Sequence, residues 1–237
     1  MKVKIIEDLK GGLIVSCQVT DERGNRDPLN PAQGPAILAA FAIACVNGGA
    51  KGVRADGPLD INAIRRVVNV PIIGCYKIDI EGYQVRITPT FEAARRIAEA
   101  GADIIAIDAT NRPRPHGVTV KQLVKRIKDE LGLPVMADIS TLEEGLKAYE
   151  AEADLIATTL SGHTSYTLNR PKPDLELVKA LSERVDVPII AEGHITTPEL
   201  ARRAIEAGAY AVVVGNMIVN PRRITEAFVR SINLARK

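Results

Sequence analysis

The sequence predicts a closed barrel of eight parallel strands with alternating helices, the (β/α)8 fold of the α/β class. Eight short apolar runs rich in β-branched residues are spaced along the 237 residues, and each is followed by a segment with helical periodicity. An Ala-Gly-Ala turn recurs ahead of two of these runs, and many of the runs end in a polar residue. Repeated strand–helix units form parallel sheets, and eight of them close into a barrel.

The predicted strands are spread over the whole chain. They span Leu13–Val19, Gly52–Ala55, Pro71–Cys75, Asp103–Ile107, Pro134–Ala137, Asp154–Thr158, Pro188–Ala191 and Tyr210–Val214. Because no Ser/Gly-rich or Pro-rich linker separates any two of them, we expect residues 1–237 to form a single barrel domain.

Two segments between the strands carry a clear helical signal. Glu92–Glu99 and Leu200–Glu206 have apolar residues at helical spacing, as an amphipathic helix requires. Each runs into an Ala-Gly-Ala turn, Ala100–Ala102 and Ala207–Ala209, where the glycine can take the left-handed conformation that ends a helix. The repeated pattern supports one repeating architecture.

Hydroxyl side chains and a proline mark the expected helix starts. Thr90, Thr141 and Thr197 stand at N-cap positions, where a side-chain oxygen accepts a backbone N–H. Pro198 fits the first helical position, because its missing N–H is not needed there.

Composition excludes several classes of partner. The net charge is +2 with acids and bases interspersed, and aromatic residues make up 3% of the chain with no Trp. A nucleic-acid surface needs concentrated positive charge and rings that stack on bases, so we expect no nucleic-acid partner. No apolar run is long enough to cross a bilayer, and MKVKIIEDLKGG at the start has no apolar signal region, so we expect no membrane partner.

The cysteines indicate a reducing compartment. Cys17, Cys45 and Cys75 are an odd number in apolar contexts and have no C-x-x-C pairing, so neither a disulfide framework nor a zinc site is expected. We therefore expect a cytoplasmic protein.

Polar residues follow the predicted strands at their carboxyl ends, where (β/α)8 barrels carry their sites. In chain order they are Gln18, Arg54, Lys77, Asp108, Asp138, Thr159 with Ser161, Glu192, and Gly215 with Asn216. A closed barrel brings all of them to one opening, whereas an open doubly wound sheet would scatter them.

Lys77 is the first candidate catalytic residue. It follows the apolar run that begins at Pro71, and because desolvation disfavours the charged form of an amine, a lysine held there is a candidate proton carrier. With carboxylates such as Glu192 it suits proton transfer at a carbon next to a carbonyl. That chemistry needs no cofactor, and the sequence has no His cluster or Cys group of the kind that holds a metal.

Two glycine-bearing turns suggest an anion site. Gly193 follows the seventh predicted strand and Gly215 follows the eighth. In this fold a phosphate often sits on the backbone N–H groups of those two loops, at the N-terminus of a short helix. No Walker or dinucleotide motif competes with this interpretation.

Several of these residues also have structural interpretations, which the sequence leaves open. Asp138 can cap the helix that follows it, and Gln18 can be a buried structural amide. Arg54 can bridge to Asp56 or recognise an anion. Asp108 is expected to pair with Arg112 or Arg114 across its loop. The three histidines, His116, His163 and His194, are expected to be loop or surface residues.

Eight segments carry a resemblance to a known family. They are GGLIVSCQ (Gly11–Gln18), GGAKGVRADG (Gly48–Gly57), PIIGCYK (Pro71–Lys77), ITPT (Ile87–Thr90), GADIIAIDAT (Gly101–Thr110), MADISTLEEG (Met136–Gly145), TTLSG (Thr158–Gly162) and IIAEG (Ile189–Gly193). In this order they resemble the N-acetylmannosamine-6-phosphate 2-epimerases, and the likeness covers nearly the whole chain.

The resemblance implies a TIM barrel of the ribulose-phosphate-binding type and a cofactor-independent isomerase. Its substrate would be a phosphorylated N-acetylaminosugar, with N-acetylmannosamine 6-phosphate and N-acetylglucosamine 6-phosphate interconverted through an enolate-like state at C2. It also implies a role in sialic acid catabolism or other use of amino sugars. A homodimer is expected, since barrels of this kind commonly pair.

The resemblance also assigns residues. The family's proton-transferring lysine falls on Lys77 and its assisting glutamate on Glu192. The expected substrate-binding residues are Gln18, Arg54, Asp138 and Ser161.

The expected phosphate-binding residues are Gly193, Gly215, Asn216 and Asn220, and here the chain departs from the family pattern. The family usually ends its eighth loop in Gly-Gly-Ala-Ile-Thr-Arg-Pro, with the arginine on the phosphate. This chain has Asn220 in place of that arginine. Arg222 and Arg223, one turn further on, are the candidates for its role.

Two other functions are compatible with the residues. Lys77 can form a Schiff base in an aldolase or lyase on a sugar phosphate. A barrel without the phosphate arginine can also bind an aminosugar and not turn it over.

Overall fold

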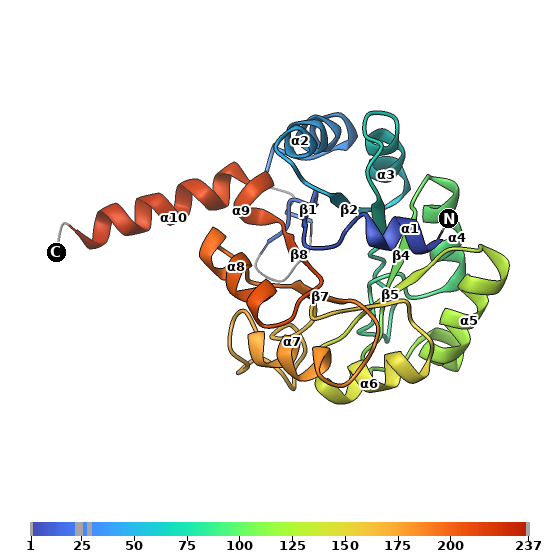
Figure 1. The fold of residues 1–237 in the computed structure, drawn as a ribbon. Helices are drawn as coiled ribbons and strands as arrows, with labels where there is room; N and C mark the ends of the chain where they lie inside the picture. Colours follow the sequence, from blue (N-terminus) through green and yellow to red (C-terminus); the bar gives the residue numbers. More distant parts are fainter. Residues whose placement is uncertain (1, 22–25, 28–29, 236–237) are drawn as a thin grey trace.

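The computed structural model describes residues 2–21, 26–27 and 30–235 and has the predicted architecture. All eight strands are parallel, each pairs with the next in sequence, and β8 pairs with β1 to close the barrel. Figure 1 shows the strands at the centre of the molecule and most of the helices arranged around them. The (β/α)8 prediction is confirmed.

The helices and strands alternate in the expected order. The strands are β1 (Leu13–Ser16), β2 (Gly52–Asp56), β3 (Ile72–Cys75), β4 (Ile104–Asp108), β5 (Val135–Asp138), β6 (Leu155–Ala157), β7 (Ile189–Glu192) and β8 (Ala211–Val214). The helices are α1 (Lys2–Glu7), α2 (Pro35–Asn47), α3 (Pro58–Arg65), α4 (Phe91–Glu99), a 3-10 turn η1 (Pro115–Gly117), α5 (Val120–Glu130), α6 (Leu142–Glu150), α7 (Leu175–Ser182), α8 (Pro198–Glu206), α9 (Asn216–Val219) and α10 (Pro221–Leu234).

The first predicted strand is too long, and the structure gives the reason. Cys17 still donates its backbone N–H to the carbonyl of Arg54 at 2.8 Å, but the chain then turns back on itself. Thr20 and Arg26 form an isolated antiparallel bridge, and Asp27 donates to the carbonyl of Val19 at 3.2 Å. The apolar run therefore continues past the strand into this turn.

Helix starts and ends follow the sequence signals. The Oγ1 atoms of Thr90, Thr141 and Thr197 each accept the backbone N–H three residues on. In the two Ala-Gly-Ala turns, Gly101 has φ 105° and Gly208 has φ 101°, a conformation that residues with a Cβ rarely adopt. The predicted caps and turns are confirmed.

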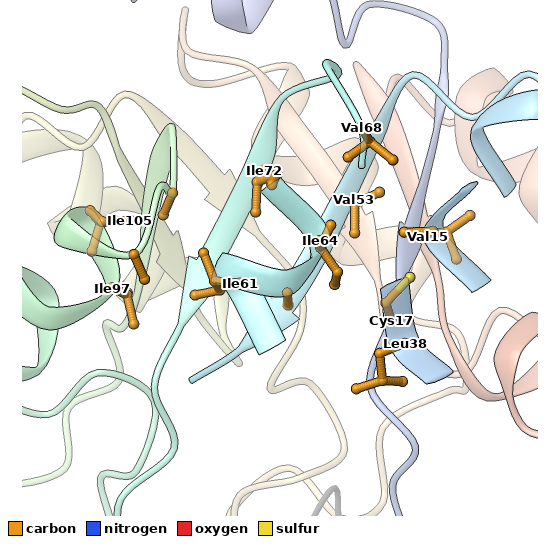
Figure 2. Packing of buried hydrophobic residues seen from close by; sticks show 14 of the residues in the cluster. Val15, Cys17, Leu38, Val53, Ile61, Ile64, Val68, Ile72, Ile97 and Ile105 are labelled. Carbon is orange, nitrogen blue, oxygen red and sulfur yellow. The ribbon is translucent and has the colours of Figure 1, made fainter. Parts of the chain in front are cut away.

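The strands separate two apolar layers, because alternate residues of a strand point to opposite faces. Val15, Val53 and Ile72 belong to a cluster that also contains Leu38 of α2 and Ile61 of α3, so these strand residues face the helices. Figure 2 shows this packing. The other strand residues form a separate fully buried cluster that fills the barrel: Ile14, Ile73, Ile104, Met136, Leu155 and Ile190.

The amino end of the barrel is closed by the residues that precede β1. Leu9 is fully buried in the interior cluster, and Ile5 and Ile6 of α1 pack against the same cluster. The backbone N–H of Gly11 donates to the carbonyl of Tyr210 at 2.8 Å, which holds this segment in place. The site must therefore lie at the other end of the barrel, at the carboxyl ends of the strands.

The last helix departs from the usual arrangement. No residue of α10 is buried, and in Figure 1 the helix extends away from the barrel to the C-terminus. Phe228 and Leu234 expose 68% and 72% of their surface. Within the described ranges, neither α10 nor any other helix has the length and apolar composition that a bilayer crossing needs.

Candidate active site

The strand register places the predicted site residues on the inner face of the barrel. Residues paired across a parallel ladder point to the same side, and Arg54 pairs with Ile73, an interior residue. Asp108 pairs with Asp138 in the same layer, two residues beyond the interior pair Ala106 and Met136. The same alternation carries Gln18, Lys77, Thr159 and Glu192 to the carboxyl end of the interior. The register thus gathers these side chains at one end of the barrel.

Arg54 is at the centre of this group. Its Nη1 and Nη2 atoms lie 3.0 Å and 2.5 Å from the two carboxylate oxygens of Asp138, and Nη1 also lies 2.5 Å from Oε2 of Glu192. Thr159 donates its hydroxyl to Asp138 at 2.6 Å. The side chains of Arg54 and Asp138 are 1% and 0% exposed, and that of Glu192 is 12% exposed. One guanidinium thus holds two carboxylates, and only Glu192 reaches the opening.

The contacts decide two of the structural alternatives. Asp138 does not cap the following helix, because Thr141 does so together with Glu144 in a capping box. The carboxylate of Asp56 accepts the backbone N–H of Lys77 at 2.9 Å, and the guanidinium of Arg54 is engaged by other carboxylates. The interpretation of Asp138 as a helix cap and that of Arg54 as a bridge to Asp56 are therefore both wrong.

Burial dominates the electrostatics of the cluster. Desolvation raises the pKa of the Glu192 carboxyl, although the charges of Arg54 and Lys77 act to lower it. Desolvation acts to lower the pKa of Arg54, but the charges of Asp138 and Glu192 more than offset this and raise the pKa well above its usual value. Arg54 is thus a fixed cation, and Glu192 is the group of this pair that can change protonation state.

Lys77 lies on the other side of the opening, beyond β3. Its ammonium donates to Oε1 of Gln18 at 2.7 Å, and the Gln18 amide donates to the hydroxyl of Ser16 at 3.1 Å. Gln18 is 8% exposed, so its amide is largely buried, and its oxygen orients the amine. The charge of Lys77 acts to lower the pKa of Glu192, and both residues lie at the carboxyl ends of their strands.

Thr158 fixes the backbone under Glu192, a contact that sequence reasoning did not find. Its hydroxyl donates to the carbonyl of Glu192 at 3.0 Å and accepts the Glu192 N–H at 3.1 Å. The alternation of strand faces was the available sequence signal: Thr159 points inward, so its neighbour Thr158 points to the other face.

Asp108 is largely structural, as expected. It accepts from the backbone N–H and the hydroxyl of Thr110 at 3.1 Å and 2.6 Å, and it pairs with Arg112 at 2.6 Å. Arg112 is therefore the correct partner of the two proposed. The pair fixes the start of the loop after β4.

The two glycine loops come together beyond β7 and β8. Gly193 has φ 106°, and α9 begins directly after Gly215. Within the described residues, no protein group accepts a hydrogen bond from the backbone N–H of Gly193, Gly215 or Asn216. These groups are available to an anion.

The side chains of Asn216 and Asn220 form hydrogen bonds with other groups of the protein. Asn220 is fully buried, accepts from Asn30 at 2.7 Å and from the Arg223 N–H at 3.2 Å, and caps α10. It donates to Asn216 at 3.1 Å, and Asn216 donates to the hydroxyl of Thr20 at 3.1 Å. The asparagine that replaces the family's arginine thus acts here as a helix cap.

The other candidate residues have protein partners as well. Ser161 is buried and donates to Asp174, the N-cap of α7, at 2.7 Å. Arg222 pairs with Asp27 and Glu226, and Arg223 pairs with Glu226. Among the described residues, no group of three His, Cys, Asp or Glu side chains is arranged to hold a metal ion.

Two of the histidines lie on loops, as expected, but the sequence did not predict their contact with each other. His163, after β6, and His194, after β7, stack with ring centroids 4.7 Å apart and planes 10° from parallel. Nε2 of His194 is buried with no hydrogen-bond partner among the described residues. Desolvation, with the charges of His163 and Lys172, lowers the pKa of His194 to about 4. A stacked pair of imidazole rings therefore lies next to the loop of Gly193.

The closed parallel barrel and the amine, carboxylate and guanidinium at its carboxyl end define the class of (β/α)8-barrel enzymes. The model of a family described as putative N-acetylmannosamine-6-phosphate epimerase matches residues 38–234. The chain belongs to this N-acetylmannosamine-6-phosphate epimerase family.

Individual relatives agree with the family match. A protein of Caldanaerobacter subterraneus subsp. tengcongensis named putative N-acetylmannosamine-6-phosphate 2-epimerase is 49% identical over 233 residues, 98% of this chain and 95% of the relative. A protein of Thermosynechococcus vestitus with the same name is 46% identical over 216 residues, 91% of each chain. The solved structure of the N-acetylmannosamine-6-phosphate 2-epimerase from Clostridium perfringens superposes with a TM-score of 0.88 at 40% identity and covers 95% of each chain.

Proposed function

We propose that this protein is an epimerase that interconverts N-acetylmannosamine 6-phosphate and N-acetylglucosamine 6-phosphate. The observation that carries the proposal is the placement of the Lys77 amine and the Glu192 carboxylate at one opening of the barrel. Relatives that share 40–49% of the sequence over nearly its full length bear the name of this activity. The reaction is a step in the use of sialic acid and other amino sugars.

The proposed mechanism uses the two groups for proton transfer at C2. Opening of the sugar ring exposes an aldehyde at C1, which makes the neighbouring C2 proton acidic. Lys77, oriented by the amide of Gln18, takes part in removing that proton, and the electron pair passes into an enolate-like state. Return of a proton to the opposite face of C2 gives the epimer. Glu192 holds the open chain and assists the transfer.

Arg54 and Asp138 have a positioning role in this proposal. Both are buried below the opening, so they support the site by fixing Glu192 and by holding its charge. Gln18 and Ser161 are the other two residues of the proposed substrate-binding set. Ser161 is proposed to contribute indirectly, by anchoring the start of α7.

The phosphate group is proposed to bind at the glycine loops. The backbone N–H groups of Gly193, Gly215 and Asn216 have no protein acceptor within the described residues, and the first turn of α9 adds its partial positive charge. Asn220 supports this site indirectly, because it caps α10 and holds Asn216 in place.

Hydrogen exchange at C2 tests the function. Incubated in heavy water with either epimer, the protein is expected to incorporate deuterium at C2 and to form the other epimer, as followed by proton NMR. Borohydride is expected to trap no covalent adduct, because no Schiff base forms. Trapping with either sugar phosphate, or unlabelled C2 after extended incubation, would reject the proposed mechanism.

The protein is further proposed to act as a single-domain cytoplasmic homodimer that pairs through α10. Phe228, Val229 and Ile232 lie on one face of this helix by helical spacing and expose 49% to 68% of their surface, and the helix extends away from the barrel (Figure 1). A contiguous apolar stripe of this kind marks a protein interface. A second copy is the proposed occupant, because no residue of α10 is buried and the helix extends away from its own barrel, within reach of another.

Light scattering after size-exclusion chromatography measures the assembly. Wild type is expected to be a dimer of about twice the 25.5 kDa chain mass, and the double variant Phe228→Asp with Ile232→Asp is expected to be a monomer, because the charges cannot be buried at an interface. Arg230→Gln, a polar change on the same helix, should stay dimeric. A monomeric wild type at micromolar concentration would contradict the proposal.

A further inference from the structure

A cavity of about 500 Å³ lies outside the barrel interior, where the loop after β4 meets α5 and α6. Its wall includes this loop from Ala109 to Arg114, the first residues of α5, and Lys147, Ala148 and Glu150 of α6 with the adjoining Ala151. Neither Lys77 nor Glu192 lines it. Its volume is within the range of about 300–1,000 Å³ that small-molecule sites occupy.

Positive charge predominates in the wall of this cavity. Its cationic residues are Arg112, Arg114, Lys121 and Lys147, and its one acid is Glu150. Two of the cations have protein partners: Arg112 pairs with Asp108, and Lys147 pairs with Glu143 at 2.6 Å. Arg114 and Lys121 make no ion pair within the described residues.

Arg114 is the residue that requires an explanation. It is 5% exposed, and both its terminal nitrogens are buried with no hydrogen-bond partner in the described part of the chain. The carboxylate of Asp108 acts on it but is already engaged by Arg112 and Thr110. Burial lowers the pKa of Arg114, which reflects how poorly this environment supports its charge. A buried guanidinium without an acceptor is strongly unfavourable, so an external anion would stabilise it.

The start of α5 supplies further donors at the same place. Val120 and Lys121 are the first residues of this 11-residue helix, and both line the cavity. Thr119 caps the N–H of Gln122, and the first turn contains no acidic residue. The N–H groups of Val120 and Lys121 and the positive end of the helix therefore face no competing negative charge from this turn.

We propose that this cavity is a second anion site that binds a small phosphate-bearing molecule. Its phosphate pairs with Arg114 and Lys121 at the N-terminus of α5. Phosphate fits this donor set because a guanidinium fork and a helix N-terminus both present several N–H groups to a tetrahedral anion. The site is separate from the phosphate position proposed at the glycine loops and does not depend on the epimerase activity.

Crystals soaked in tungstate, a tetrahedral dianion with strong anomalous scattering, locate the site. An anomalous peak is expected in the cavity beside Arg114, whether or not a second peak occurs at the glycine loops. Peaks confined to the barrel mouth would overturn the proposal, and so would crystals of the wild type without any peak.

Calorimetric titration with inorganic phosphate tests the same site in solution. Arg114→Gln is expected to weaken one phosphate-binding step at least tenfold. Lys121→Gln, at an exposed position that does not affect folding, is expected to weaken the same step. Lys179→Gln on α7, an exposed lysine outside the cavity, is the matched control and should titrate as wild type. Identical titrations of wild type, Arg114→Gln and Lys121→Gln would overturn the proposal.

Discussion

Replacing Lys77 with alanine is expected to lower kcat/KM for epimerisation by about 1,000-fold, because a positioned acid–base group contributes about 10²–10⁴. Deuterium incorporation at C2 is expected to fall by a similar factor. The amine that hydrogen-bonds to Gln18 is removed, and alanine has no group that can carry a proton in its place. Proton NMR in heavy water measures both quantities in one sample.

The control for this variant is Lys179→Ala, which removes an exposed ammonium from α7 and should leave the rate unchanged. The melting temperature of Lys77→Ala is also expected to stay near that of wild type, because Lys77 is partly exposed at the opening. Wild-type activity in Lys77→Ala would remove Lys77 from the mechanism.

Replacing Arg54 with methionine is expected to give the largest loss of stability. The guanidinium is 1% exposed and pairs with both Asp138 and Glu192, so the variant leaves the fully buried carboxylate of Asp138 without its counter-ion and removes the ion pair of Glu192. Breaking a buried ion pair from one side costs about 3–5 kcal/mol, which for a chain of this size lowers the melting temperature by about 10 °C. Urea unfolding followed by circular dichroism measures the loss.

A second substitution distinguishes charge from packing. Adding Asp138→Asn to Arg54→Met removes the charge of the carboxylate that has lost its partner. The double variant should therefore recover part of the lost free energy of unfolding. Arg95→Met removes an exposed arginine that pairs with Glu92 and Glu99 on α4 and should change the free energy of unfolding very little, because solvent screens these ion pairs. If Arg54→Met were as stable as Arg95→Met, the buried cluster would not hold the site together.

The fold was predictable because local signals agreed with the final structure. Each apolar run became a strand within a few residues of its predicted bounds, and the threonine caps at 90, 141 and 197 start helices as expected. The one clear error in bounds, at the first strand, arose because Val19 is buried beyond the end of the strand, where its carbonyl accepts from Asp27, and not in the sheet. Burial alone does not tell these two states apart.

The inward direction of the site residues was predictable for the same reason, but their partners were not. Strand alternation carries Arg54, Asp138 and Glu192 to one layer, while the sequence gives no measure of which pairs will meet across the barrel. The stacking of His163 on His194 joins two loops 31 residues apart in sequence. Contacts of this kind depend on how the loops fold over the barrel, for which no periodicity exists.

The sealed amino end of the barrel has a kinetic consequence. Leu9 fills the interior from below, so a sugar that enters at the strands' carboxyl ends must also leave there. Both epimers then use the same opening of the barrel and cannot bind there at the same time. Each should act as a purely competitive inhibitor of the other's conversion, and progress towards equilibrium should slow as product accumulates.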